Sequence, residues 1–186
     1  MKKLIFTIFG STGDLTSRKL LPALSKLYKE QKIARETKVI CLGRKDLDTK
    51  SYLSYMNDES STSLDLDILE KIVEYHKIQI TDKDDDSTLK ELLSSNSDEN
   101  TKQLFYLAIG PELFFDVAKN INHSGLIGKN NENQLIIFEK PFDGFAPTFC
   151  EGLCAVTKAG YCFSNANNSL RNSSYCASVI SGASFW

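Results

Sequence analysis

The sequence predicts an α/β fold in which a doubly wound, mostly parallel sheet is followed by an irregular or disordered C-terminal tail. Over residues 1–145, short apolar runs alternate with segments of helical periodicity, as expected when helices cover both faces of a parallel sheet. Over residues 146–186, only three charged side chains occur and no periodic apolar face is visible. We therefore expect one domain over 1–145 and a low-charge tail, rich in Ser, Asn and Cys, over 146–186.

Five apolar runs are short enough, and rich enough in β-branched and aromatic residues, to be strands. The first follows a Met-Lys-Lys start and imitates a signal peptide, but six apolar residues are fewer than the roughly 7–15 of a secretory core. We interpret it as a buried strand of a cytoplasmic protein. The predicted strands are residues 4–9, 38–44, 77–80, 103–109 and 134–138.

The segments between these runs have helical spacing. The first carries Leu20, Leu21 and Leu24 on one face, with Pro22 either opening a new helix or kinking the run, since proline lacks the N–H that an interior position donates. A longer helix is expected from Lys45 to Tyr75. Shorter helices are expected over residues 88–93 and 112–122.

Charge and composition exclude several classes of function. The chain has 186 residues, with 22 Lys and Arg against 24 Asp and Glu, and a net charge of −2. No basic block is available to bind a nucleic-acid backbone, so no nucleic-acid partner is expected. No apolar run approaches the roughly 20 residues that span a bilayer, so no membrane partner is expected either.

A glycine turn joins the first strand to the first helix, with the sequence Gly-Ser-Thr-Gly-Asp-Leu over residues 10–15. A bound pyrophosphate needs glycines for close backbone approach and free amide donors at a helix N-terminus, whose partial positive charge favours an anion. The turn lacks the common G-x-G-x-x-G spacing, and a simple turn with Asp14 as a helix cap is the alternative. Its place between a buried strand and a helix favours nucleotide binding.

Two further segments lie at predicted strand ends. Arg44 follows Gly43 where a dinucleotide site meets the adenosine ribose, and its planar donors suit a 2′-phosphate, although a solvated surface arginine is equally compatible. Asp46 lies close by and could accept a ribose hydroxyl, so NAD remains an alternative coenzyme. Lys140, in the Phe-Glu-Lys-Pro-Phe segment of 138–142, could direct its ammonium at a substrate, or be a surface lysine before an edge proline.

Together these segments resemble the opening of glucose-6-phosphate dehydrogenase. The resemblance runs through residues 9–15, 18–24, 106–111, 117–121 and 138–142 and covers residues 1 to about 143. It implies a Rossmann-like NADP-binding domain, with coenzyme phosphates along residues 10–15, the 2′-phosphate on Arg44, and Lys140 bridging coenzyme and substrate. The cofactor-binding residues that it implies are Gly10, Ser11, Thr12, Gly13, Asp14, Leu15, Arg44, Ala108, Ile109, Pro111 and Lys140.

The resemblance also implies a reaction, hydride transfer from C1 of glucose 6-phosphate to NADP⁺ in the oxidative pentose phosphate pathway. Two departures are visible: Gly110 replaces the first of two prolines, and Phe114 replaces a tyrosine. The family's substrate-phosphate segment and its general-base histidine have no match, and we interpret His76 and His123 as surface residues. We therefore expect a chain truncated after the Glu-Lys-Pro-Phe motif and inactive alone, with glucose 6-phosphate as a partner only if the missing half is supplied.

Alternatives remain open at this point. The chain could be a non-catalytic NADP(H)-binding or regulatory module, or belong with glucose–fructose oxidoreductases, which share a Glu-Lys-Pro strand end but carry a third glycine in the turn. The tail could be a frameshift product or an evolved element. Its four cysteines lack the close pairs of a zinc site, so no metal is expected, and Cys41 is predicted to be a buried apolar residue.

Overall fold

The computed structural model describes residues 2–78, 83–96, 100–110, 113, 117 and 133–138. Five strands form one sheet in the order β3-β2-β1-β4-β5, and every neighbouring pair is parallel. This topology confirms the predicted doubly wound sheet. The strands are β1 (Leu4–Phe9), β2 (Lys38–Gly43), β3 (Val73–Lys77), β4 (Lys102–Leu107) and β5 (Gln134–Phe138).

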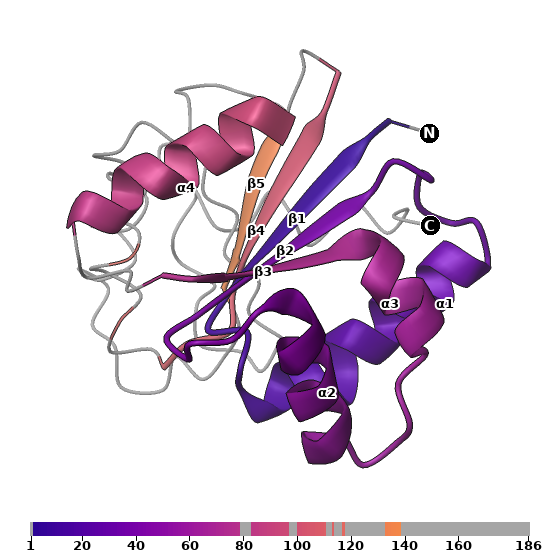
Figure 1. Cartoon of the computed structure of the whole chain (residues 1–186). Helices are drawn as coiled ribbons and strands as arrows, with labels where there is room; N and C mark the ends of the chain where they lie inside the picture. Colours follow the sequence, from indigo (N-terminus) through magenta and orange to yellow (C-terminus); the bar gives the residue numbers. More distant parts are fainter. Residues whose placement is uncertain are drawn as a thin grey trace, which may run out of the picture.

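Helices cover both faces of this sheet (Figure 1). One face carries α1 (Leu21–Lys29), α2 (Thr49–Glu59) and α3 (Leu66–Ile72), and the opposite face carries α4 (Lys83–Asn96). Alternate side chains of each central strand therefore enter two separate cores. In β1, Ile8 packs with the residues of α1, α2 and α3, whereas Ile5 and Phe9 pack with Leu89 and Leu93 of α4. Burial on both faces explains why the strands have almost continuous apolar sequences.

A π-helix, η1 (Thr16–Leu20), leads into α1 and resolves the position of Pro22. The Leu21 N–H donates to the Thr16 carbonyl, five residues back, and Pro22 falls in the first turn of α1. The backbone stays helical from Leu15 through η1 into α1, so Pro22 lies at the junction of a π-helical turn and an α-helix, where its missing N–H interrupts the hydrogen-bond ladder. The structure therefore agrees better with an interrupted run than with a separate new helix.

The long helix predicted from Lys45 to Tyr75 is wrong at its start, because α2 begins at Thr49, and also in its middle and at its end. Residues 60–65 form a Ser- and Thr-rich connection in which side chains bond the backbone instead of allowing a helix to continue. The Leu64 N–H, for example, donates to Asn57 Oδ1 at 2.9 Å. The segment thus forms two helices, α2 and α3, rather than one.

The third strand begins earlier than the predicted 77–80, since it spans Val73–Lys77, and residues 79–80 lie outside the described residues. Val73 takes an extended conformation (φ −96°, ψ 133°) directly after α3. Val73 and Tyr75 then enter the core beneath α2 and α3, while Glu74 and His76 lie on the other face. These two buried residues have the spacing of two that is typical of a strand. The helical spacing of the preceding apolar residues was extended over them in the sequence prediction.

The remaining boundaries agree within a few residues. β1 and β5 match their predictions, β2 ends one residue early at Gly43, β4 spans Lys102–Leu107, and α4 extends the predicted 88–93 helix at both ends. The predicted helix over 112–122 and the boundary near Phe145 lie largely or wholly outside the described residues. Over the part of the chain that is described, no helix combines the length and apolar character needed to cross a bilayer.

Candidate functional site

The candidate site lies beyond the carboxyl ends of β1 and β4. β1 is the first strand, yet it occupies the centre of the sheet, with β2 on one side and β4 on the other. The chain connections diverge there, and ligands of doubly wound sheets bind in the crevice that this divergence opens. The sequence places the glycine turn of 10–15 after β1 and residues Ala108 and Ile109 after β4.

Gly10 brings these two segments into direct contact. Its φ is +74°, in the left-handed region that favours glycine. A Cβ atom at this position would lie 2.5 Å from the Ala108 carbonyl oxygen and 2.6 Å from Ile109 Cγ2. The Ala108 N–H also donates to the Phe9 carbonyl at 2.9 Å. Gly10 therefore seats the loop against the end of β4, whereas the predicted close approach of this loop to a pyrophosphate stays a prediction.

The loop presents unpaired amides where the helical segment begins at Asp14. Within the loop, the Gly13 N–H donates to the Gly10 carbonyl at 3.2 Å, and the Thr16 N–H donates to the Gly13 carbonyl at 3.1 Å. Among the described residues, no protein acceptor faces the N–H groups of Thr12, Asp14 and Leu15. Unpaired amides at a helix start carry partial positive charge, and they suit a phosphate or pyrophosphate.

The side chains of the loop differ in their surroundings. Ser11 is completely buried, and among the described residues its Oγ has no hydrogen-bond partner. Asp14 is exposed and forms an ion pair with Arg18 one turn later, so its carboxylate does not cap the helix. The loop therefore offers a ligand mainly backbone donors, as the sequence interpretation required.

Arg44 stands directly after β2, at the same end of the sheet as the loop. Its side chain is exposed, and none of the residues that the structure describes forms an ion pair with it. Asp46, the candidate for a ribose hydroxyl, is 87% exposed and pairs instead with Lys77, with 3.0 Å between Oδ2 and Nζ. Arg44 is thus an unpaired cation at this edge, whereas the charge of Asp46 is already partly compensated.

Gly43 packs the loops that follow β1 and β2 against each other. A Cβ atom on Gly43 would lie 2.9 Å from Thr12 Cγ2 and 2.8 Å from the Tyr75 hydroxyl oxygen. The Ser11 N–H donates to the Leu42 carbonyl at 2.9 Å. The loop of 10–15 and the segment that carries Arg44 therefore form one packed unit at the carboxyl edge of the sheet.

Two predicted site residues, Pro111 and Lys140, lie outside the described residues, as do Phe114 and His123. Gly110 is described, and its carbonyl accepts from the Leu113 N–H at 3.0 Å. The structure thus brings together residues 10–15, Arg44, Ala108 and Ile109. The contributions of Pro111 and Lys140 remain predictions.

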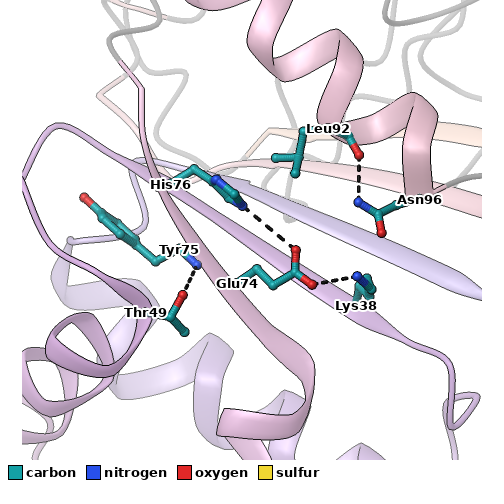
Figure 2. Close-up of polar contacts among 7 residues, drawn as sticks. All are labelled: Lys38, Thr49, Glu74, Tyr75, His76, Leu92 and Asn96. Atoms are coloured by element: carbon teal, nitrogen blue, oxygen red, sulfur yellow. Dashed lines mark hydrogen bonds and ion pairs between the residues drawn. The ribbon is translucent and has the colours of Figure 1, made fainter.

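His76 lies away from this edge site, on β3 at the margin of the sheet. Figure 2 shows Glu74 between His76 and Lys38, with 2.6 Å from its carboxylate to Lys38 Nζ and 3.9 Å to His76 Nε2. His76 was expected at the surface, and its side chain is partly exposed. No group of three potential metal ligands occurs among the described residues. Lys38 and Glu74 thus form an ion pair with the His76 imidazole beside it, and His76 lies on β3, two strands from β1.

Sequence reasoning missed two tyrosines beneath the loops. Tyr52 of α2 is completely buried, and its hydroxyl donates to the Ser11 carbonyl at 2.9 Å. Tyr75 of β3 is 5% exposed, and its hydroxyl donates to the Lys45 carbonyl at 2.8 Å. The only signal in the sequence was the apolar spacing of Tyr52, Leu53 and Met56, which predicts burial but not a polar contact with another loop.

Comparison with known proteins agrees with this geometry. The family described as "Glucose-6-phosphate dehydrogenase, NAD binding domain" matches residues 7–148. The chain belongs to this family. The glucose-6-phosphate 1-dehydrogenase of Bacillus subtilis is 31% identical over 151 residues, which cover 78% of this chain and 31% of the relative. That of Leuconostoc mesenteroides is 29% identical over 147 residues, covering 75% and 30% of the two chains.

A solved structure of glucose-6-phosphate dehydrogenase with its substrate glucose 6-phosphate superimposes with a TM-score of 0.72 at 26% identity, covering 88% of this chain and 36% of that one. The resemblance stated from the motifs is confirmed, and the glucose–fructose oxidoreductase alternative is set aside. The chain spans about 30% of the length of the dehydrogenases that it matches. The match falls on their coenzyme-binding domain and not on the rest of their length.

Proposed function

We propose that this glucose-6-phosphate dehydrogenase domain binds NADP(H), with the coenzyme pyrophosphate against the amides of residues 10–15. The observation that carries the proposal is that the N–H groups of Thr12, Asp14 and Leu15, at a helix start where β1 and β4 diverge, meet no acceptor in the described part of the chain. Phosphate oxygens supply the acceptors that these amides lack. The nicotinamide ribose would border Ala108, Ile109 and Pro111, as the family resemblance implies.

NADP is proposed over NAD because of the charge at the end of β2. The exposed guanidinium of Arg44 offers planar donors to a 2′-phosphate, and no described residue competes for it. Asp46 would compete less strongly for a ribose hydroxyl because Lys77 pairs with its Oδ2 and partly compensates its charge. The bound nicotinamide ring would supply the hydride acceptor, while the chain's own residues would bind and orient it.

The activity of the whole family, oxidation of glucose 6-phosphate, is proposed for this domain only together with a substrate-binding part. Lys140 would there bridge coenzyme and sugar phosphate. Hydride transfer from a sugar hydroxyl also needs a general base, which typically contributes about 10²–10⁴-fold to the rate. His76, held beside Glu74 on the edge strand β3, is poorly placed for that task. A non-catalytic NADP(H)-binding or regulatory module is the second candidate, and the family match to a coenzyme-binding domain is compatible with it.

Calorimetric titration with NADP⁺ and NAD⁺ tests the proposal. Wild-type protein is expected to bind NADP⁺ more tightly. Arg44→Ala should weaken NADP⁺ binding by about 10- to 100-fold, the loss expected for a charge-assisted bidentate contact, and leave NAD⁺ binding unchanged.

Arg35→Ala is the matched control, since Arg35 is an exposed arginine preceding the opposite end of β2, with its guanidinium over the Tyr28 ring. It should leave both affinities unchanged. Equal loss in the two variants, or no binding of either nucleotide, would contradict the proposal.

We further propose a cytoplasmic location and a domain boundary near Phe145, with no nucleic-acid or membrane partner. The net charge of −2 supports the absence of a nucleic-acid partner, and the fall in charged residues after Phe145 supports the boundary. Limited proteolysis tests the boundary, because a fragment ending near residue 145 is expected to persist.

A further inference from the structure

We propose that Tyr52 and Tyr75 form a stacked pair that positions the two coenzyme-binding loops, Tyr52 holding the pyrophosphate loop and Tyr75 holding the Arg44 segment. The inference deepens the proposed function and rests on it. The two rings lie 4.4 Å apart at an interplanar angle of 15°. Each hydroxyl donates to a backbone carbonyl of a different loop, at 2.9 Å to Ser11 and 2.8 Å to Lys45.

A hydrogen bond that holds a backbone carbonyl also sets the direction of the next N–H group. In a trans peptide, the carbonyl of one residue and the N–H of the next point in opposite directions. With the Ser11 carbonyl held inward by Tyr52, the N–H of Thr12 points away from the core, and among the described residues it meets no acceptor. Tyr52 therefore sets the orientation of one of the amides proposed to bind pyrophosphate.

Tyr75 acts on the second loop in the same way. Its hydroxyl holds the Lys45 carbonyl, adjacent to Arg44. Its own backbone is fixed from the other side, because the Tyr75 N–H donates to Thr49 Oγ1 at 3.0 Å, as Figure 2 shows. Thr49 opens α2, the helix that carries Tyr52. The loop after β2 is thus held by the same helix and strand that hold the loop after β1.

The pair is shielded from solvent. Tyr52 is completely buried and Tyr75 nearly so. Burial raises the pKa of Tyr52 and of Tyr75, so both hydroxyls stay protonated donors at neutral pH. Gly43 leaves no room between the two loops, since a Cβ there would meet both Thr12 and the Tyr75 hydroxyl. The loops can therefore keep one fixed spacing, which a ligand carrying a pyrophosphate and a 2′-phosphate requires.

Tyr52→Phe and Tyr75→Phe test the pair, because each keeps its ring and loses one hydrogen bond. NADP⁺, NAD⁺ and adenosine 2′-monophosphate are titrated into the full chain by NMR. Tyr52→Phe should weaken NADP⁺ and NAD⁺ binding about three- to tenfold and leave adenosine 2′-monophosphate unchanged. Tyr75→Phe should weaken NADP⁺ and adenosine 2′-monophosphate by a similar factor and leave NAD⁺ unchanged.

Tyr55→Phe is the matched control on α2, since the Tyr55 ring lies beneath Lys45 Nζ at 4.4 Å and its hydroxyl makes no hydrogen bond with a described residue. It should bind all three ligands like wild type. If one of the two variants does not fold, the ligand affinities of the other variant test the inference. Unchanged affinities in a folded variant, equal loss for all three ligands, or failure of both variants to fold would overturn the inference. Failure of the wild type to bind NADP⁺ would instead refute the proposed function.

Discussion

At Gly10 the backbone has a φ of +74° and lies against the end of β4, so a side chain there has neither a favourable conformation nor space. The left-handed conformation alone costs a non-glycine residue about 1–2 kcal/mol. The carbonyl oxygen of Ala108, which would lie 2.5 Å from an added Cβ atom, belongs to backbone that cannot rotate away. We predict that Gly10→Ala lowers the free energy of unfolding by about 2 kcal/mol or more.

Gly13→Ala provides the comparison within the same loop. A Cβ at Gly13 would meet the Gly10 carbonyl oxygen at 3.4 Å, an ordinary van der Waals distance, without a positive φ. Urea denaturation of the two variants should therefore show a much smaller loss for Gly13→Ala. Equal losses of stability would mean that the close approach of Gly10 to β4 does not restrict which residue position 10 can accept.

Cys41 gives stability a dependence on alkaline pH. Burial raises the pKa of its thiol from 9.0 to about 12. Between these values the unfolded chain releases a proton that the folded chain retains, so its contribution to stability is complete below pH 9 and declines as pH rises. We predict a loss of up to about 1.4 kcal/mol per pH unit in that range.

Cys41→Ala tests this effect because the variant lacks the thiol, and it also removes the contribution of Cys41 to the raised pKa of Tyr52 and of Tyr75. Its cavity lowers stability at all pH values, but the difference between wild type and variant should shrink from pH 9 to pH 11. Urea denaturation at several pH values measures it. A difference that stays constant with pH would show that the thiol ionises equally in both states.

The residue scale also shows what the sequence could reveal about the site. The glycines of the turn indicated a place where backbone is closely approached, and in the structure Gly10 lies against Ala108. Close approach to a pyrophosphate stays a prediction. The contacts of Tyr52 and Tyr75 could not be predicted. They join residues separated by 41 and 30 positions, and only the packing of α2 and β3 beside the loops brings them together.

Among the elements, α2 connects the candidate site to its support, and Asp48 begins it. The Asp48 carboxylate accepts from the Ser51 N–H at 2.7 Å, and this hydrogen bond lowers the pKa of the carboxyl below 3.8. A lowered pKa means that the stabilisation is present above pH 4 and is lost as pH falls through the folded value. Asp48→Ala should therefore reduce stability at neutral pH.

Asp48→Asn separates the cap from its charge, because an asparagine caps a helix about as well and does not titrate. Its stability should stay close to that of wild type at pH 7 and should exceed wild type as pH falls from 4 to 2. Thermal unfolding by circular dichroism at these pH values tests the sign. If wild type instead became more stable than Asp48→Asn as the pH falls, the result would contradict the lowered pKa.

The elements that the sequence predicted best are those with one dominant signal. β1 and β5 are continuous apolar runs, and their bounds were predicted without error. β3 was misplaced because Leu69, Ile72 and Val73 continue a helical pattern into a strand whose own pattern has only two buried members, Val73 and Tyr75. Tertiary packing against α2, including the Thr49 contact, decided between the two periods.

For the whole molecule, alternation of strands and helices was sufficient to predict a parallel, doubly wound sheet, and it indicates the carboxyl edge of that sheet as the candidate site. The order β3-β2-β1-β4-β5 places the loop after β1 between Arg44 on one side and Ala108 on the other. Composition cannot specify the spacing of these residues, because it depends on three strands and one helix packing together.

The chain by itself is predicted to bind coenzyme without oxidising glucose 6-phosphate. His76 is two strands from β1, and the chain spans about 30% of its catalytic relatives. NADPH absorbance at 340 nm, followed with glucose 6-phosphate and NADP⁺, should not rise above a protein-free control. Turnover comparable to that of a complete dehydrogenase would contradict the prediction.

The most direct measurement of the central claim is an amide-resolved NMR titration of the full chain with NADP⁺. The N–H groups of Thr12, Asp14 and Leu15 have no protein acceptor in the described structure, so a bound pyrophosphate should give them the largest saturable shifts. NAD⁺ should shift the same three amides with a weaker affinity. Saturable shifts confined to other amides, or none with either nucleotide, would contradict coenzyme binding at this loop.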